Sequence, residues 1–282
     1  MKIGFIGAGR VGVSLGRYFC EHGVPVTGYC SKTLRSAREA ATFTGTMSFR
    51  DIEAITEISD ALFLTVPDRV VTELWDRIKR LPIQNKIICH CSGAFSSAVF
   101  SKIESRHAYG YSIHPLYAFS DREQAYKGLS DVLFTIEGAE AGMKDIRRLF
   151  AQLGNPFQVI SSQDKARYHA AAVFAANGMT ALAHTAARLL SDCGFSEADA
   201  RRALGPMLLR HAETVVCDGS VAAITGPVER GDAVTVARHL SCLNEEDKAL
   251  YLLLSRKLLA VSRQKNPGKR YDALEELLGE AE

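Results

Sequence analysis

A glycine-rich turn near the amino terminus restricts the fold of this chain more than any other feature. The stretch IGFIGAGRVG contains Gly7, Gly9 and Gly12 in the spacing G-x-G-x-x-G. The pattern alone is a weak signal, because glycine is common in proteins. Here it directly follows an apolar strand and opens a helix, VGVSLGRYFCEHG, which is the context of a dinucleotide-binding βαβ unit. The alternative is a glycine-rich turn without a ligand.

Each glycine has its own task in such a turn. Gly7 permits the tight turn, Gly9 removes the Cβ atom that would block a pyrophosphate, and Gly12 lets the helix and the strand pack closely. The free N–H groups at the start of the helix then face the anion. We therefore expect the cofactor to contact Gly7, Ala8, Gly9, Arg10, Val11 and Gly12.

The residues after the second expected strand predict which dinucleotide is bound. NAD enzymes place an acidic residue about 20 residues further on, where it binds the ribose 2′-hydroxyl. Here no acid appears until Glu39, while Ser31, Lys32 and Arg35 offer a hydroxyl and two cations. These groups suit a 2′-phosphate, so the sequence favours NADP over NAD. The alternative for Lys32 and Arg35 is a solvated first turn of the next helix.

Strands and helices alternate up to about residue 160, and only helices are expected after it. The sequence therefore predicts an α/β fold, with a Rossmann-type, doubly wound and mainly parallel sheet over residues 1–160. An all-α domain over residues 161–282, for substrate binding and dimerisation, would follow. Apolar runs predict strands over 2–6, 25–29, 61–66, 86–90, 108–113, 131–136 and 157–160.

Helix signals are clear along the rest of the chain. Helices are expected over 68–80 and 142–154, between strands. Ser161 with Asp164, and Ser196 with Asp199, are capping patterns that open helices running to about 192 and 217. A Gly/Pro loop over 224–232 precedes helices over 233–240, 245–262 and 270–280, with Asp232 as the expected cap of the first.

Polar and rigid residues follow several strands, at the sheet edge where ligands bind in such folds. Thr65, Val66 and Pro67 follow the third strand and are expected near the cofactor, with Thr65 at the ribose. Ser92 and His114 follow the next two strands and are expected near a nicotinamide ring. For His114 a purely structural role is the alternative.

The composition excludes several classes of partner. The 282 residues carry a net charge of +2, with no block of Lys and Arg that would indicate nucleic acid or a membrane surface. No stretch approaches the length of a membrane span. Seven cysteines, without framework spacing, predict reduced thiols and a cytoplasmic protein. Cys89-His90-Cys91 predicts buried strand residues rather than a metal site.

Taken with these motifs, the chain resembles the bacterial Rossmann-like NADP oxidoreductases that have a carboxyl-terminal helical domain of unassigned function. These are relatives of pyrroline-5-carboxylate reductase and of the 6-phosphogluconate and β-hydroxyacid dehydrogenases. The resemblance covers nearly the whole chain and implies the fold, NADP and a homodimer. It is carried by IGFIGAGRVG, TVPD (65–68), HCSGA (90–94), SIHPL (112–116), YHAAAVFAANG (168–178) and TGPVERGDAVTVARHL (225–240).

The stretch KARYHAAAVFAANG contains the main catalytic candidates. Lys165, His169 and Asn177 would favour one side of a regular α-helix, with His169 and Asn177 about 12 Å apart along its axis. Lys165 or His169 would deliver a proton, and Asn177 would hold the polar end of the substrate. β-Hydroxyacid dehydrogenases carry Lys followed four residues later by Asn; His169 at that position departs from their pattern. The structural alternative makes His169 and Asn177 satisfied core residues and Lys165 a surface residue.

The sequence therefore predicts an NADP-dependent reductase of a small carbonyl or imine compound, such as a 2-oxo acid. Arg230 could pair with a substrate carboxylate, or could tie its loop to a neighbouring helix. The alternatives are a non-catalytic NADP-binding sensor, whose helical domain is an interaction surface, and a fold that has lost its cofactor.

Overall fold

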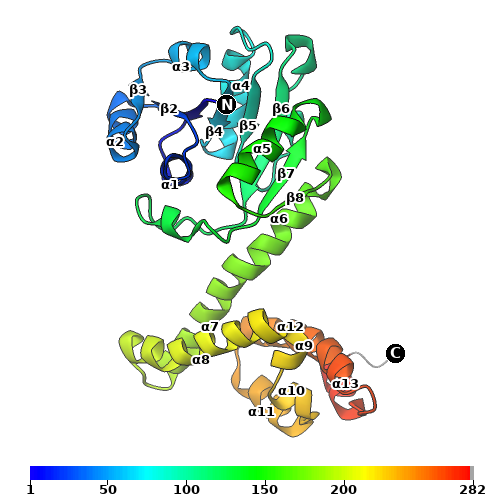
Figure 1. Ribbon diagram of the computed structural model, residues 1–282. Coiled ribbons are helices and arrows are strands. Elements are labelled where there is room, and N and C mark those ends of the chain that lie inside the picture. The colour runs from blue at the N-terminus through cyan, green and yellow to red at the C-terminus, as the bar shows by residue number, and fades with distance from the viewer. Residues whose placement is uncertain (280–282) are drawn as a thin grey trace. The chain divides into compact units, whose positions relative to one another are not determined.

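The computed structural model describes residues 1–279, which fall into two compact units, Met1–Asn177 and a second that begins at Gly178 (Figure 1). The first unit is built on an eight-stranded sheet with the order β3-β2-β1-β4-β5-β6-β7-β8. Its strands are β1 (Ile3–Ile6), β2 (Val26–Cys30), β3 (Met47–Phe49), β4 (Ala61–Leu64), β5 (Ile87–His90), β6 (Tyr109–Pro115), β7 (Phe134–Gly138) and β8 (Phe157–Val159).

Strands β1 to β6 pair in parallel, and only the pair β6·β7 is antiparallel among the described pairs. The order 3-2-1-4-5-6 is that of the Rossmann fold, so the expected fold class is confirmed. The seven expected strands are all present. Strand β3 was missed because its three residues, MSF, are too short to show a pattern.

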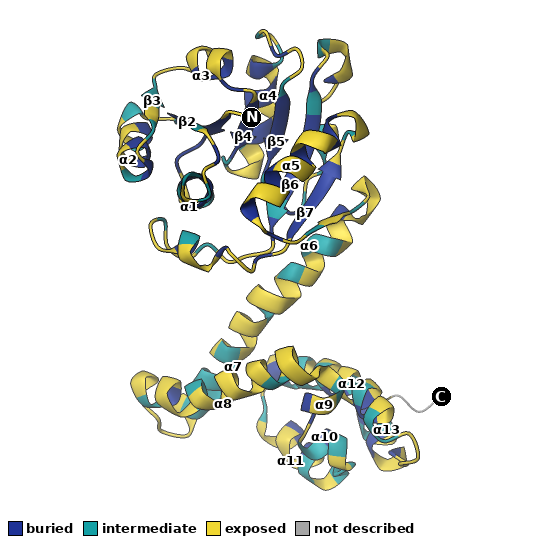
Figure 2. Cartoon of the chain, viewed as in Figure 1, coloured by how far each residue is buried: buried dark blue, intermediate teal, exposed yellow. Residues whose placement is uncertain are grey.

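Helices cover both faces of the sheet. One face packs against α1 (Arg10–Glu21), α2 (Leu34–Thr44) and α5 (Met143–Leu153), and the other against α3 (Ile52–Ile58) and α4 (Asp68–Ile78). Neighbouring strand residues point to opposite faces: Phe63 belongs to the first core, and Leu62 and Leu64 to the second. The inner strands are consequently buried on both sides, while the edge strands β3 and β8 are partly exposed (Figure 2). Short 3₁₀ helices lie at η1 (Ser97–Val99), η2 (Glu104–Arg106), η3 (Ala125–Gly128), η4 (Glu140–Gly142) and η5 (Ser162–Asp164).

The long helix expected after residue 160 is present, but it is not regular. Helix α6 (Lys165–Val173) passes into a π-helical segment, η6 (Phe174–Gly178), and continues as α7 (Met179–Asp192). The expected domain boundary near residue 160 marks where the strands end. The first compact unit continues to Asn177, because the start of α6 packs against the sheet domain through Lys165.

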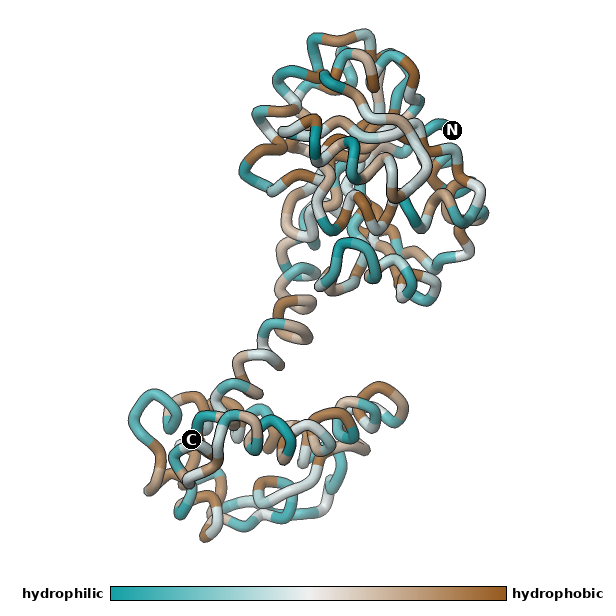
Figure 3. The backbone as a smooth tube through the Cα atoms, turned by 90° about the vertical axis from the view of Figure 1, so that its left-hand side faces the viewer, coloured by the Kyte–Doolittle hydropathy of each residue, from teal (hydrophilic) through white to brown (hydrophobic). Residues whose placement is uncertain are grey.

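The described part of the second unit contains helices and no strand. They are α7, α8 (Glu197–Asp218), α9 (Ser220–Ala223), α10 (Pro227–Arg230), α11 (Ala233–Cys242), α12 (Glu245–Lys265) and α13 (Asp272–Leu278). Hydrophobic and hydrophilic stretches alternate along these helices (Figure 3). A small core holds α10 to α13 together; it consists of Val228, Val236, Leu240, Leu259, Tyr271, Leu274 and Leu278.

The expected helix caps form. Asp232 accepts a hydrogen bond from the Thr235 N–H at 3.0 Å and so opens α11, as predicted. Ser161 and Ser196 cap their helices in the same way. The expected loop over 224–232 is partly wrong, because Pro227 starts the one-turn helix α10 within it. Residue 280, the end of the last expected helix, lies outside the described residues.

Candidate active site

The glycine-rich turn connects β1 to α1 and packs directly on the end of β4. Gly7 has a φ angle of 114°, and a Cβ atom placed there would lie 2.5 Å from the carbonyl oxygen of Thr65. A Cβ atom at Gly12 would overlap the Thr65 hydroxyl. Both glycines are therefore required by the approach of the turn to β4, as the sequence predicts.

Gly9 differs, because it faces open space. A Cβ atom there would have only the Thr65 carbonyl oxygen within 4.0 Å. Gly9 is the N-cap residue of α1 and provides no side-chain cap, so the helix starts with N–H groups that lack intrahelical partners. Such N–H groups bind anions, and the missing side chain leaves room for one. These residues fit the pyrophosphate of a dinucleotide.

Thr65 has a structural task in this turn. Its hydroxyl donates a hydrogen bond to the Gly7 carbonyl at 2.9 Å, which ties the end of β4 to the glycine-rich turn. Val66 and Pro67 follow it, and Pro67 is the N-cap residue of α4. The expected contact of Thr65 with the cofactor ribose stays a prediction, and its hydroxyl already has a partner inside the protein.

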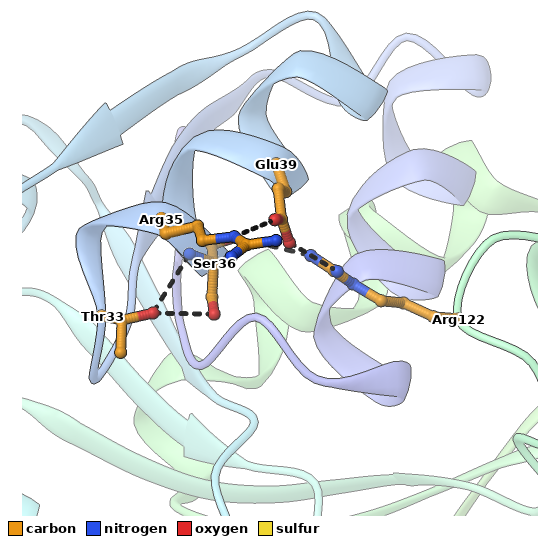
Figure 4. Close-up of polar contacts among 5 residues, drawn as sticks. All are labelled: Thr33, Arg35, Ser36, Glu39 and Arg122. Atoms are coloured by element: carbon orange, nitrogen blue, oxygen red, sulfur yellow. Dashed lines mark hydrogen bonds and ion pairs between the residues drawn. The ribbon is translucent and has the colours of Figure 1, made fainter.

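Several cations surround the start of α2. Thr33 caps this helix by accepting a hydrogen bond from the Ser36 N–H, and the largely exposed Arg35 pairs with Glu39 at 2.9 Å (Figure 4). Arg122 reaches the same place from the segment between β6 and β7, and pairs with Glu39 at 3.3 Å. Ser31 and Lys32 precede Thr33, and Lys32 is exposed. The sequence gives no local signal for Arg122.

Lys165 is the buried cation of the first unit, with 2% of its surface exposed. Its ammonium group donates hydrogen bonds to the Ser112 hydroxyl at 2.8 Å and to the Ser92 carbonyl at 3.1 Å. Burial lowers the pKa of Lys165 to about 8. A buried lysine is rare in proteins. Lys165 is thus not a surface residue, and the structural alternative for it is excluded.

Ser92 organises the turn after β5. Its hydroxyl donates to the Asp68 carboxylate at 2.9 Å and accepts hydrogen bonds from the N–H groups of Ala94 and Phe95. Its carbonyl oxygen is the group that contacts Lys165. Asp68 is the first residue of α4, and it holds this turn rather than capping its own helix.

Two histidine side chains meet at Gly93. A Cβ atom at Gly93 would lie 2.9 Å from Nε2 of His114 and would overlap the ring of His169. The two rings are 6.2 Å apart, edge to face. Burial, followed by the charge of Lys165, lowers the pKa of His114 to about 3. His114 is therefore neutral at physiological pH.

Tyr168 also belongs to this cluster, and the sequence analysis does not predict a role for it. Its hydroxyl lies 2.7 Å from Nδ1 of His114, and its ring lies 5.5 Å from the ammonium group of Lys165. Lys165 and Tyr168 are three residues apart on α6, so they share a face of the helix. That spacing was the available signal, although tyrosine alone is too common to single out.

Asn177 and Arg230 both have exposed side chains. Asn177 belongs to the π-helical segment η6, which is not the regular α-helix assumed for the expected angles, so its shared direction with Lys165 and His169 stays a prediction. It is not a satisfied core residue. Arg230 is the exposed last residue of α10, in the second unit. The structure thus brings together Ser92, His114, Lys165 and His169, and their roles stay predictions.

Cys89-His90-Cys91 lies at the end of the buried strand β5 and the start of the turn that follows it. His90 is fully buried, with Nε2 at 3.1 Å from the Ser96 carbonyl and Nδ1 accepting a hydrogen bond from the Ser92 N–H. Within residues 1–279 no three metal-ligating side chains converge. None of the helices described there combines the length and apolarity that crossing a membrane would need.

Solved structures share this fold. The protein TM1727 from Thermotoga maritima is 25% identical, with a TM-score of 0.73 over 93% of this chain and 99% of that chain. A Bacteroides fragilis protein, provisionally described as an NADP oxidoreductase, is 23% identical, with a TM-score of 0.73 over 92% and 98%. Pyrroline-5-carboxylate reductase from Coxiella burnetii is 12% identical, with a TM-score of 0.58 over 95% and 98%.

Family comparisons agree with the two-part organisation. No curated protein matches the chain. Residues 1–115 match the family described as Rossmann-like domain, and residues 132–258 match the family described as domain of unknown function (DUF2520). The resemblance inferred from the sequence is confirmed: the chain carries a Rossmann-like domain followed by a DUF2520 domain.

Proposed function

We propose that this protein is an NADP-dependent reductase of a small carbonyl or imine compound. The observation that carries the proposal is the buried Lys165, which is held beside two histidines at the end of β5 and β6. Ligands bind at this edge of such a sheet, and the glycine-rich turn opens at the same edge. A buried cation with a lowered pKa is typical of catalytic sites.

NADP would be held by the glycine-rich turn and by the start of α2. The N–H groups after Gly9 would bind the pyrophosphate, and Ser31, Lys32 and Arg35 the 2′-phosphate. When bound, NADPH supplies a hydride to the substrate carbon. The description of the Bacteroides fragilis structure as an NADP oxidoreductase supports this choice of cofactor.

A proton must reach the substrate oxygen or nitrogen as the carbon accepts hydride. An ammonium group has three donors, and the Ser92 carbonyl and the Ser112 hydroxyl use two of those of Lys165. The third can point to the substrate, so Lys165 is our first candidate for the proton donor. His169 is the second candidate, because its ring also borders Gly93.

The proposed substrate is small, and a 2-oxo acid or a cyclic imine acid fits it. The name of the Coxiella burnetii structure, a pyrroline-5-carboxylate reductase, supports a substrate of the second kind. Asn177 and Arg230 remain candidates for holding its polar end or its carboxylate. We further propose a cytoplasmic homodimer that forms through the carboxyl-terminal helices.

A fluorescence titration with NADPH and NADH tests the proposed cofactor. We expect NADPH to bind in the micromolar range and NADH at least tenfold more weakly. Arg35→Ala should weaken NADPH binding about tenfold and leave NADH binding unchanged, because it removes a cation proposed to bind the 2′-phosphate, a group that NADH lacks. Arg38→Ala is the matched control, since Arg38 is exposed on the same helix.

Equal binding of the two cofactors would overturn the assignment of the 2′-phosphate site. With binding established, a screen of 2-oxo acids and cyclic imines follows NADPH oxidation at 340 nm. Binding without turnover of any of them would favour the sensor. No binding of either cofactor would favour a fold that has lost its cofactor.

A further inference from the structure

His114 and Tyr168 form a hydrogen-bonded pair beside Lys165, the proposed proton donor. His114 lies on β6 and Tyr168 on α6, and the Tyr168 hydroxyl is 2.7 Å from Nδ1 of His114. The two rings meet edge to face, with centroids 5.6 Å apart. The ring of Tyr168 is also 5.5 Å from the ammonium group of Lys165. The pair is thus held from both sides, by the sheet and by the buried cation.

The chemistry of the two groups decides the direction of the hydrogen bond. Burial raises the pKa of Tyr168, so the phenol keeps its proton. Burial also keeps the imidazole of His114 neutral. A phenol is a better donor than a neutral imidazole N–H, and an imidazole nitrogen is a better acceptor than a phenol oxygen. Nδ1 therefore accepts the phenol proton, and the ring proton of His114 must sit on Nε2.

The Nε2 edge of the His114 ring lies against Gly93, in the turn after β5 beside which we place the proposed substrate. A Cβ atom at Gly93 would be 2.9 Å from Nε2, and the ring of His169 borders the same point. Within residues 1–279 no hydrogen-bond partner is found for Nε2. An N–H group that is fixed in direction and has no partner is ready to donate to a ligand.

We propose that Tyr168 is a positioning residue, which holds His114 in the Nε2–H tautomer so that a neutral N–H group is aimed at the substrate oxygen or nitrogen beside Gly93. This inference rests on the proposed reductase function for its catalytic part. The tautomer itself does not depend on that function. In this arrangement the Lys165 ammonium group delivers the proton, and the neutral Nε2–H group of His114 orients the substrate oxygen or nitrogen that receives it.

The tautomer can be measured directly in the full-length protein. Two-dimensional ¹H–¹⁵N correlation of histidine rings distinguishes Nε2–H from Nδ1–H, and the variant His114→Gln identifies the His114 signals by their loss. We expect the Nε2–H pattern for His114, and a mixture of tautomers in Tyr168→Phe. An unchanged Nε2–H pattern in Tyr168→Phe would overturn the proposal.

A matched control exists in the second unit. Tyr251 lies 2.8 Å from Nδ1 of His239, with rings 5.7 Å apart and edge to face. Tyr251→Phe removes the same kind of hydrogen bond from another histidine and leaves the contact between Tyr168 and His114 in place, so it should leave the His114 signals and the turnover unchanged. Thermal unfolding and NADPH binding of Tyr168→Phe check that this variant folds; if it does not, His114→Gln and His114→Asn still test the proposal.

Turnover of the reduced substrate gives the second readout. The amide nitrogen of Gln replaces Nε2 of histidine in space, and that of Asn replaces Nδ1. We expect His114→Gln to retain at least tenfold more kcat than His114→Asn, and Tyr168→Phe to lose about tenfold in kcat with an unchanged KM for NADPH. Equal kcat in the two His114 variants would overturn the role of Nε2. If the wild-type protein reduces nothing, the proposed function fails, while the tautomer experiment still decides the role of Tyr168.

Discussion

Gly93 has no side chain, and this allows two histidine rings to pack against its backbone. The rings of His114 and His169 approach the position where a Cβ atom would be. Gly93→Ala should therefore displace both rings and lower kcat at least tenfold, while overpacking costs about 1–3 kcal/mol of stability. Steady-state kinetics and thermal unfolding measure the two effects.

The control for Gly93→Ala is Gly268→Ala. Gly268 lies in the turn between α12 and α13, and a Cβ atom there would have no neighbour within 4 Å. Replacing glycine by alanine at an unstrained position stabilises a protein by about 0.4–1 kcal/mol, because the unfolded chain loses conformational freedom, so this variant should be at least as stable and equally active. Full activity of Gly93→Ala would show that the two histidines do not need this approach.

The buried ammonium group of Lys165 should lower the stability of the folded protein, although it is the proposed proton donor. Its pKa falls from 10.5 to about 8 on folding, mainly through burial, although Glu137, Cys91 and Asp68 oppose the shift. Between pH 8 and pH 10.5 the unfolded chain binds a proton that the folded protein lacks. The stability contribution of this group therefore rises with pH in that window, and its cost is full below pH 8.

Lys165→Met should remove that cost and the proposed proton donor together. We expect kcat to fall at least 100-fold, and the free energy of unfolding at pH 7 to be equal to or higher than that of the wild type. Urea unfolding at pH 7 and pH 10 measures the free energy of unfolding. The increase in this free energy from pH 7 to pH 10 should be smaller in Lys165→Met than in the wild type. A wild-type kcat that falls above about pH 8 would agree with a protonated Lys165. A Lys165→Met variant that is less stable than the wild type, and whose stability depends on pH in the same way, would contradict the predicted cost of burying Lys165.

At the scale of elements, the local patterns of the sequence predict the helices well and the burial of their side chains less well. Asn177 lies in the π-helical segment Phe174–Gly178 and is exposed, while Lys165 begins the same continuous helix and is buried. A helical wheel describes only the direction of a side chain around the axis. Asn177 follows Lys165 by twelve positions, which is about 18 Å along the axis at 1.5 Å per residue, so a shared direction does not imply shared burial.

At the scale of the whole molecule, the second unit exposes large apolar side chains. Leu209 and Val216, seven residues apart on α8 and thus on one face, are 75% and 83% exposed. Soluble proteins rarely leave such side chains in water when they cluster. This exposure supports the proposed homodimer, with a second copy of the chain covering α8.

The oligomeric state tests this proposal. We expect light scattering after gel filtration to give the mass of a dimer, twice the 30.8 kDa of one chain. Leu209→Asp with Val216→Asp should weaken the dimer at least 100-fold, because each substitution places a charge in an apolar interface. Arg201→Ala, at another exposed position of α8, should leave it intact. A monomeric wild-type protein would rule the dimer out.

The sequence by itself determines the features that depend on neighbouring residues. The glycine-rich turn, the βαβ order and the helix caps are local patterns, and each is present as predicted. Short range is the physical reason, because backbone conformation and capping involve residues a few positions apart.

Only the tertiary structure decides which side chains meet. Lys165 contacts Ser92 and Ser112 across 73 and 53 residues of chain, and Tyr168 meets His114 across 54. Arg122 reaches Glu39 across 83. No local pattern encodes such contacts, since they follow from how the sheet edge, the start of α6 and the segment after β6 pack. Whether a lysine is a solvated cation or a buried one with a lowered pKa depends on that packing alone.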